Sequence, residues 1–189
     1  EALKSLRLNL LGQSRDKALL RDVVRELHGQ GTGRPQAQAL AQAVKQERER
    51  LRRMFNAHGG DIGEIDNYGL THAHDPRKLR EAGFDAWRDA IKDRLDWHRI
   101  TDNATGKPFA IAAGARPDPA AADAFLRRVF NNIASESAVS MEPSMGGGSR
   151  GKALYNQRAE ARLLHFKDGD AWWDYNDAFG RMQPFDAMV

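Results

Sequence analysis

The stretch "QAQALAQAVKQERERLRRMFNAHGG", residues 36–60, decides the fold class of this chain. Its apolar side chains return every three or four positions, which is the period of an amphipathic α-helix, and two glycines end it. The side chains expected on one face of this helix are Ala37, Leu40, Ala41, Val44, Leu51, Met54 and Phe55. No segment of the chain alternates polar and apolar residues long enough to predict a β-strand. The sequence therefore predicts a mainly α-helical protein.

One or two amphipathic helices are expected upstream of this stretch, in residues 2–11 and 14–29, and the nearer one directly precedes it. Ser14 is its candidate N-cap and Gly29 its stop signal. Because only a short turn rich in glycine and proline separates the two helices, we expect them to form an antiparallel hairpin. The core residues predicted for the upstream helix are Leu19, Leu20, Val23, Val24 and Leu27.

Two further helices are expected downstream, and an aspartate followed by a proline marks the start of each. Asp75 and Asp118 are suited to cap helices whose first positions are the prolines that follow them. The first of these helices is predicted over residues 76–97 and the second over residues 120–136. Glycine at position 83 is the only interruption in the first core stripe, which contains Leu79, Phe84, Trp87, Ile91 and Leu95.

Residues 153–180, "ALYNQRAEARLLHFKDGDAWWDYNDAFG", combine basic, acidic and aromatic side chains and predict a helical hairpin. Basic residues share one face of the first helix, an aspartate caps the second, and aromatic side chains pack between the two. We interpret the cluster as packing rather than a nucleic-acid surface, because aspartates interleaved with the aromatics would repel phosphates. The structural or interaction residues predicted here are Arg158, Arg162, His165, Asp168, Asp170, Trp172, Trp173 and Tyr175.

The order of these segments predicts three regions joined by long ordered loops, in an elongated or partner-dependent arrangement. Residues 1–60 form an N-terminal helical hairpin, residues 61–145 a loop-rich helical region, and residues 146–189 a Gly-rich hinge with the aromatic hairpin. The chain starts at Glu1 without a methionine, and Pro184 is typical of the first turn of another helix. We therefore expect a segment of a longer polypeptide.

Composition narrows the classes of function. The 189 residues contain no cysteine, which excludes disulfides, thiolate metal sites and a cysteine nucleophile. Lysine and arginine number 29 against 26 acidic residues, so the formal net charge of +3 permits DNA binding without demanding it. No apolar run approaches the roughly 18 residues of a membrane span, and no signal peptide is visible.

Motifs for catalysis and metal binding are weak. His72, His74 and Asp75 have the side chains of a zinc or manganese site, but their spacing lacks the H-x-x-x-H pattern of helical metal ligands. Asp75 is also expected to be the N-cap of the helix that begins at Pro76. The glycines before Lys152 are not preceded by a strand, and Ala153 stands where a phosphate-binding loop has serine or threonine. The sequence therefore predicts no catalytic residue and no cofactor.

Three blocks together resemble very long internal virion proteins of tailed bacteriophages. The blocks are residues 67–109, which begin "NYGLTHAHDPRK", residues 125–136, "FLRRVFNNIASE", and residues 157–180, "QRAEARLLHFKDGDAWWDYNDAFG". The third block is similar to the run R-x-LHFKD-x-D-x-W-x-x-Y-x-x-x-FG of that family and is followed by "PFDAM". One departure is that Gly69 and Leu70 follow the tyrosine where the family has a proline.

The resemblance implies a structural segment of an ejection protein, packaged in the capsid near the portal and released into the host cell with the genome. The partners it implies are other copies of the chain, the portal or other virion proteins, and DNA. Peptidoglycan cleavage in that family belongs to other regions of the parent chain, so the resemblance implies no enzyme here. The alternative hypothesis is an enzyme domain, a cell-wall hydrolase or metal-dependent hydrolase that uses the loop of His72, His74 and Asp75.

Overall fold

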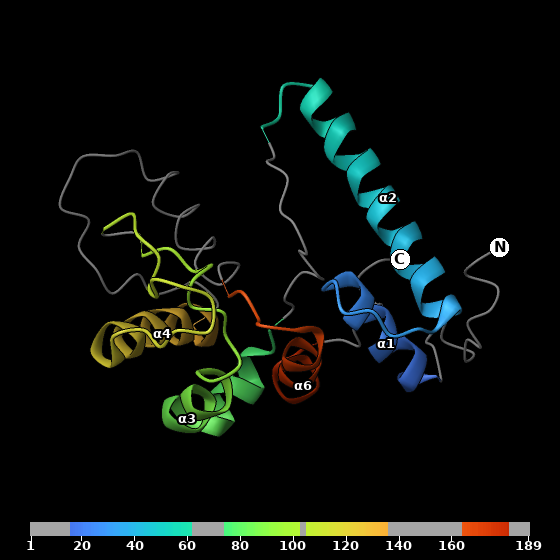
Figure 1. Ribbon diagram of the computed structural model, residues 1–189. Coiled ribbons are helices and arrows are strands. Elements are labelled where there is room, and N and C mark those ends of the chain that lie inside the picture. The colour runs from blue at the N-terminus through green and yellow to red at the C-terminus, as the bar shows by residue number, and fades with distance from the viewer. Residues whose placement is uncertain (1–15, 62–73, 103–104, 136–163, 182–189) are drawn as a thin grey trace. The chain divides into compact units, whose positions relative to one another are not determined.

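The computed structural model describes residues 16–61, 74–102, 105–135 and 164–181 of the chain (Figure 1). Extended pairing within these ranges is limited to three isolated bridges. The mainly α-helical class predicted from the sequence is therefore confirmed. The helices of the described ranges are α1 (Lys17–Leu27), α2 (Pro35–Ala57), α3 (Pro76–Ile91), α4 (Pro119–Ala134) and α6 (Gly169–Phe179).

The described residues divide into two compact units. Unit 1 contains residues 16–61 and 168–173, and unit 2 contains the described residues of 74–167 together with 174–181. The division passes through α6, so the residues of this helix up to Trp173 belong to unit 1 and those from Asp174 belong to unit 2.

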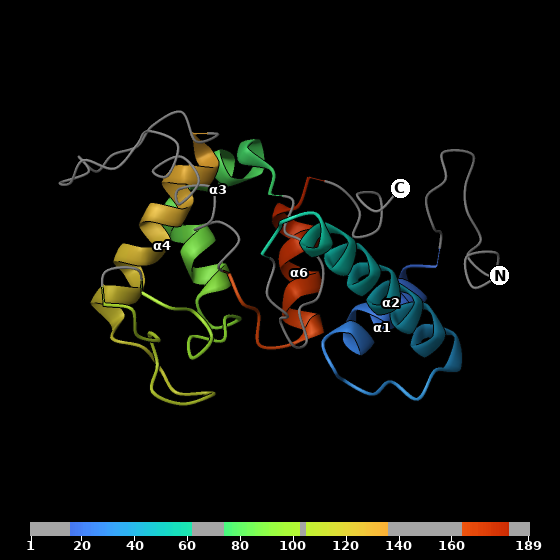
Figure 2. The ribbon, with the colours of Figure 1, turned by 90° about the horizontal axis from the view of Figure 1, so that it is seen from above.

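Unit 1 is built on the pairing of α1 with α2 (Figure 1; Figure 2). The whole apolar face of α1 is buried, and burial of one such aliphatic side chain contributes about 1.5–3 kcal/mol. Asp16 is the N-cap of α1, because its carboxylate accepts a hydrogen bond from the backbone N–H of Leu19 at 2.8 Å. The prediction of Ser14 as the cap is therefore wrong by two positions. The buried face of α1 consists of Leu19, Leu20, Val23, Val24 and Leu27.

A Schellman motif ends α1 and directs the chain into the turn before α2. Gly29 has a φ of 80°, its N–H donates to the carbonyl of Glu26 at 3.1 Å, and the N–H of Gln30 donates to the carbonyl of Arg25 at 2.9 Å. Gly29 is thus the stop signal that the sequence predicts. The Glu26 carboxylate then accepts hydrogen bonds from the backbone N–H and the hydroxyl of Thr32, at 2.6 and 2.7 Å. These two bonds hold the turn and lower the pKa of Glu26.

Helix α2 is covered over only part of its length. Its buried residues, Ala37, Leu40 and Ala41, all lie in the first two turns. Leu51, Met54 and Phe55 share the apolar stripe in sequence but are exposed to 44%, 49% and 55%. Figure 1 shows most of α2 extending past the end of α1. The expected single apolar face therefore exists, but only its part in the first two turns is buried.

Unit 2 is formed by α3 and α4, which lie side by side in both views (Figure 1; Figure 2). Asp75 caps α3 by accepting from the N–H of Arg77 at 2.9 Å, and Asp118 caps α4 by accepting from the N–H of Ala121 at 2.8 Å. Both helices begin at the predicted prolines. The two aspartate caps and the prolines that follow them are confirmed as helix start signals.

Two features of α3 differ from a regular helix over residues 76–97. Gly83 has a φ of 77° and a ψ of 165°, so it breaks the helix at the position where the apolar stripe is interrupted. The helix then ends at Ile91. Beyond it, the indole of Trp97 donates to the carbonyl of Lys92 at 2.9 Å, which closes a compact turn instead of further helix.

Aromatic side chains fill the space between α3 and α4. Trp87 is fully buried, and its ring centroid lies 5.6 Å from that of Phe130. Phe84 meets Phe130 edge to face at 5.7 Å, which is the preferred geometry of aromatic pairs. A second group from the connector and α4 packs around Phe125, whose ring centroid lies 5.0 Å from Phe109 and 6.0 Å from Trp97.

Candidate functional site

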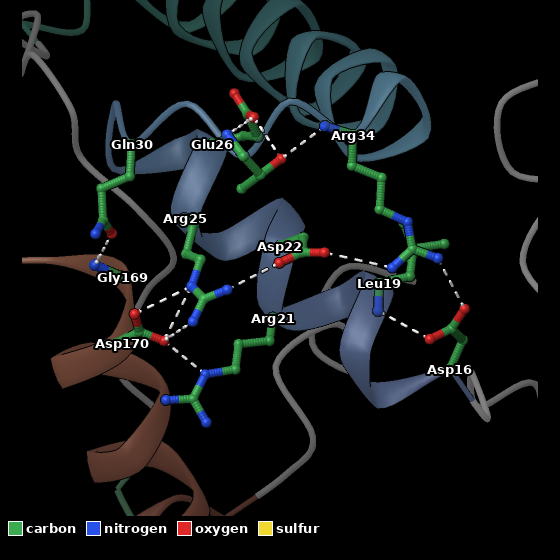
Figure 3. A network of polar contacts seen from close by, with 11 residues as sticks. Asp16, Leu19, Arg21, Asp22, Arg25, Glu26, Gln30, Arg34, Gly169 and Asp170 are labelled. Atoms are coloured by element: carbon green, nitrogen blue, oxygen red, sulfur yellow. Dashed lines mark hydrogen bonds and ion pairs between the residues drawn. The ribbon is translucent and has the colours of Figure 1, made fainter.

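Asp170, one of the charged residues predicted near the start of α6, pairs with two arginines of α1, as Figure 3 shows. The Asp170 carboxylate accepts a hydrogen bond of 2.6 Å from Nε of Arg21. It also accepts from Nε of Arg25 at 3.0 and 3.1 Å, one distance to each carboxylate oxygen. These side chains are about one-third exposed, with values of 33% to 36%. Asp170 is therefore held by two guanidinium groups at the border of solvent.

The same contacts continue into an alternating chain of charges across α1 and the start of α2 (Figure 3). Arg25 also binds Asp22 at 3.0 Å. Arg34 binds Asp22 at 3.3 Å and Asp16 at 3.4 Å. With Arg21 and Asp170, the network contains three arginines and three aspartates, so its formal charges cancel. We call these six residues the α1 charge network.

The pairing of Asp170 with Arg25 shifts the pKa values of both groups. Burial raises the pKa of Asp170, but the hydrogen bonds from Arg25 and Arg21 outweigh burial and leave the pKa below its ordinary value. The hydrogen bond to Asp170 is in turn the main reason why the pKa of Arg25 is raised. Both groups are charged across the physiological range. The ion pair of Asp170 with Arg25 is therefore suited to holding the start of α6 against α1 within unit 1.

Gly169 brings the start of α6 against the backbone of α1 within unit 1. Its N–H donates to the side-chain oxygen of Gln30 at 2.7 Å, and Gln30 is the residue positioned by the Schellman motif of α1. A Cβ atom at position 169 would lie 2.8 Å from Cα and 2.9 Å from the backbone N of Arg25. Backbone atoms of a helix cannot yield to such a contact, so this approach requires glycine.

The remaining predicted residues at the start of α6 are used for capping and packing. Asp168 accepts a hydrogen bond from the N–H of Ala171 at 2.7 Å, which is the interaction of a helix N-cap. Trp172 is 2% exposed and Trp173 is 8% exposed. The ring of Trp172 lies 6.4 Å from that of His28 in unit 1. Neither indole therefore presents a face for stacking with a nucleic-acid base.

Tyr175 organises a buried hydrogen-bond chain in unit 2. Its hydroxyl lies 3.2 Å from the indole Nε1 of Trp87 and 2.9 Å from Nδ1 of His74. The indole N–H is only a donor, so the tyrosine oxygen accepts from Trp87, and its own hydrogen is available to His74. Burial raises the pKa of the Tyr175 hydroxyl far above its ordinary value, which keeps it protonated.

The structure places only part of the loop considered for metal binding. His72 lies outside the described residues, His74 contacts Tyr175, and Asp75 caps α3. Within the described ranges, no group of three or more His, Asp or Glu side chains is arranged to hold a metal ion. The described contacts of His74 and Asp75 are those of structural residues.

The two predicted arginines of the preceding segment, Arg158 and Arg162, lie outside the described residues. His165 is partly buried, and its backbone carbonyl accepts from the N–H of Asp96 at 2.7 Å. Burial is the main cause that lowers the pKa of its imidazole, and the charge of Arg99 adds to it, while Asp96 acts in the opposite direction. The neutral imidazole is therefore favoured in the folded protein.

Sequence reasoning did not identify Arg21, Arg25 and Gln30 as the groups that hold residues 169 and 170. The spacing of Arg21 and Arg25, four residues apart, does place both on one face of α1 and could have indicated a carboxylate partner. Separations of 149 and 145 residues from Asp170 conceal which carboxylate that is. The role of Gly169 carries no sequence signal beyond its position at the start of a helix.

Comparisons of the chain with models of protein families, with curated protein sequences and with solved structures found no match. No helix in the described part of the chain combines the length and apolar character needed to span a membrane. Within each unit, the described site residues form charge pairs, helix caps and buried aromatic contacts.

Proposed function

We propose that the chain is a structural segment of an internal virion or ejection protein of a tailed bacteriophage. The proposal depends on one observation, which is the similarity of residues 157–180 to the run R-x-LHFKD-x-D-x-W-x-x-Y-x-x-x-FG of that family. The other two blocks, residues 67–109 and 125–136, add to it. The proposed location is the capsid interior near the portal, with release into the host cell together with the genome.

The contacts of the described residues support a structural role for this run. Phe166, Trp172, Tyr175 and Phe179 are buried, with exposed fractions between 2% and 8%. Asp168 caps α6 and Asp170 binds two arginines. Each side chain of the run named here is therefore used to stabilise the fold, as expected for a protein whose function is assembly rather than catalysis.

The proposed partners are other copies of the chain and the portal or other virion proteins, with DNA as a further contact. The α1 charge network gives no local excess of positive charge, because three arginines are matched by three aspartates. A phosphate backbone is bound through such an excess. We therefore propose protein partners first and assign no DNA site to this network.

The hydrolase hypothesis is not favoured by the described contacts. His74 is bound to the tyrosine of a buried aromatic cluster, and Asp75 is bound to the backbone of α3. A hydrolase needs groups that can reach a substrate or a metal ion. Activity on peptidoglycan that is lost in the His74→Ala variant, while the helical circular dichroism is retained, would support the hydrolase instead.

The virion proposal is tested by following the chain through genome release. Virus particles are purified from the culture that carries the gene, DNA release is triggered in half of the sample, and peptides of this chain are quantified by mass spectrometry. We expect the peptides in full particles and their loss from emptied capsids, with the major capsid protein as the constant reference. Absence from full particles, or unchanged retention after release, would contradict the proposal.

A further inference from the structure

Asp168 and Gly169 form the single Asp–Gly pair of the chain, and the sequence contains no Asn–Gly pair. An aspartate before glycine is prone to rearrangement of its own backbone. Glycine has no side chain to keep its amide nitrogen away from the neighbouring carboxyl group. The pair stands at the start of α6, where the structure gives each of the two residues a defined hydrogen-bond partner within unit 1.

The fold has a separate reason for each member of this pair. Asp168 is the N-cap of α6, because its carboxylate accepts a hydrogen bond from the N–H of Ala171 at 2.7 Å. Gly169 is buried against α1, and a Cβ atom at its position would lie 2.8 Å from Cα of Arg25. The helix start therefore needs a capping carboxylate directly before a residue without a side chain. These two needs together place a reactive dipeptide at this point of the chain.

We propose that Asp168 rearranges spontaneously to isoaspartate, and that the contacts of the start of α6 with α1 and Gln30 hold this reaction back in the folded chain. The amide nitrogen of Gly169 attacks Cγ of the protonated Asp168 carboxyl group, and one carboxyl oxygen leaves as water with the amide proton. Water then adds to the main-chain carbonyl carbon of Asp168 and breaks its bond to the Gly169 nitrogen. One water leaves and one enters, so the reaction needs no oxidant or cofactor and the chain keeps its mass.

The folded structure occupies both reacting groups. The N–H of Gly169 donates to the side-chain oxygen of Gln30 at 2.7 Å, and the Asp168 carboxylate holds the N–H of Ala171. The intermediate is a cyclic imide whose nitrogen carries no hydrogen, so it does not form while Gly169 donates to Gln30. Ring closure therefore requires that the start of α6 first leaves Gln30, which is a local opening and not global unfolding. The reaction rate thus reports how often this opening occurs.

The rearrangement removes the interactions that begin the helix. The backbone of isoaspartate runs through the side chain, and the former main-chain carbonyl of Asp168 becomes a free carboxylate. In the folded chain that carbonyl accepts from the N–H of Trp172 at 3.2 Å, and the side-chain carboxylate that caps Ala171 is consumed in the new peptide bond. A brief opening is thereby converted into a lasting loss of the cap. The inference depends on unit 1 alone and not on the virion proposal, so either one can fail without the other.

The first measurement follows isoaspartate at position 168 in the 189-residue chain at neutral pH. Isoaspartyl methyltransferase labels the new carboxylate, and electron-transfer fragmentation in a mass spectrometer assigns its position. We expect formation to be at least about tenfold slower in the folded chain than in urea, because the folded chain reacts only while the helix start is open. Asp168→Glu is the chemical control. Its longer side chain disfavours the cyclic imide, so this variant should give no signal at position 168 in either solution.

A second comparison tests the hydrogen bond from Gly169 to Gln30. Gln30→Ala removes the acceptor without altering the reacting pair, so isoaspartate should form about two- to tenfold faster than in the parent. The matched control is Gln42→Ala, which makes the same change at an exposed position of α2 and should react at the parent rate. Circular dichroism should show equal helix content in the three proteins.

The consequence for the fold is measured on chain that has been aged in urea and then refolded. Its thermal unfolding should have a lower midpoint than that of fresh parent, because the cap of α6 is lost. Asp168→Glu carried through the same treatment should keep the midpoint that it has when fresh.

Four results would overturn the proposal. The Asp–Gly pair is not reactive if no isoaspartate forms at position 168 in urea. Equal rates in the folded chain and in urea show that the fold does not protect Asp168. A parent rate in Gln30→Ala shows that its hydrogen bond to Gly169 does not control the opening. An aged chain that unfolds like fresh parent shows that isoaspartate leaves the helix start intact.

Discussion

The indole Nε1 of Trp87 donates a hydrogen bond to the hydroxyl of Tyr175 across 3.2 Å, although 88 positions separate the two residues in sequence. Both side chains are buried, with exposed fractions of 0% and 2%. The same hydroxyl lies 2.9 Å from Nδ1 of His74. The three residues join α3 to the C-terminal half of α6 within unit 2.

Removal of the Tyr175 hydroxyl should destabilise unit 2. Tyr175→Phe keeps the ring but leaves the buried N–H of Trp87 without its partner, so we expect a loss of about 1–3 kcal/mol in the free energy of unfolding. Urea titration followed by fluorescence and circular dichroism measures it. The double variant Trp87→Phe with Tyr175→Phe should lose less than the sum of the single variants. Strict additivity would show that the hydrogen bond contributes nothing.

Neutralisation of Asp170 should weaken unit 1 by a smaller amount. Asp170→Asn removes charge from two ion pairs that are one-third exposed, so solvent screening limits the expected loss to about 1 kcal/mol. Asp177→Asn, at an exposed position of the same helix, is the control. Thermal unfolding at low and high salt measures both. The difference between parent and Asp170→Asn should shrink in high salt, and an effect of equal size in Asp177→Asn would count against the charge network.

The lowered pKa of Asp170 also sets the sign of an acid dependence. The unfolded state takes up the proton more readily than the folded state, so the stabilisation is fully present above the unfolded pKa of about 4. It is lost as the pH falls through the lower folded pKa. The stability difference between the parent and Asp170→Asn should therefore be constant from pH 7 to about pH 5 and disappear in stronger acid.

A methyl group at position 169 should disrupt the contact with α1. In Gly169→Ala the new Cβ meets two backbone atoms of Arg25 at 2.8 and 2.9 Å, and we expect a loss of about 1–3 kcal/mol from overpacking. Gly31→Ala is a matched control in the same unit, because a Cβ at position 31 has no atom within 4 Å. Equal unfolding midpoints of the two variants in urea would refute the close approach.

His165 should make stability depend on pH near neutrality. Its pKa in the folded protein is lowered, mainly by burial and further by Arg99, so the unfolded state binds the proton first as the pH falls. The contribution of His165 to the free energy of unfolding is fully present above the ordinary imidazole pKa of about 6.5. It declines as the pH falls below that value. Unfolding measured between pH 8 and pH 5 should show a shallower decline in His165→Gln. The control variant His58→Gln, at the exposed C-cap of α2, should decline like the parent.

Local signals in the sequence were sufficient to place the helix starts of unit 2. An aspartate accepts from the first free N–H groups of a helix and a proline fixes the first backbone angle, so Asp75 and Asp118 act without help from distant residues. Gly29 ends α1 for an equally local reason, its positive φ. Such features depend on neighbours within four residues, which a sequence shows directly.

Contacts between residues far apart in the chain could not be predicted from the sequence in this way. Asp170 can pair with any nearby guanidinium, and only the fold selects Arg21 and Arg25. The apolar spacing of residues 76–97 predicts one helix. A helix and a compact turn can both bury Leu95 and Trp97, so the spacing does not distinguish them. In the structure the helix ends at Ile91 and a turn follows. The apolar stripe of α2 likewise does not reveal how far along the helix α1 reaches.

The central structural claim is that the aromatic and charged run at the start of α6 stabilises the fold and does not bind DNA. The most direct test combines thermal melts with salt-titrated DNA binding for Trp172→Ala, Trp173→Ala, Arg21→Ala and Arg25→Ala. The account predicts losses of about 3–5 kcal/mol for each tryptophan variant, as for large-to-small core changes, and about 1 kcal/mol for each arginine variant, with DNA binding unchanged. Tryptophan variants that melt like the parent, together with arginine variants that lose DNA with a reduced salt slope, would contradict it.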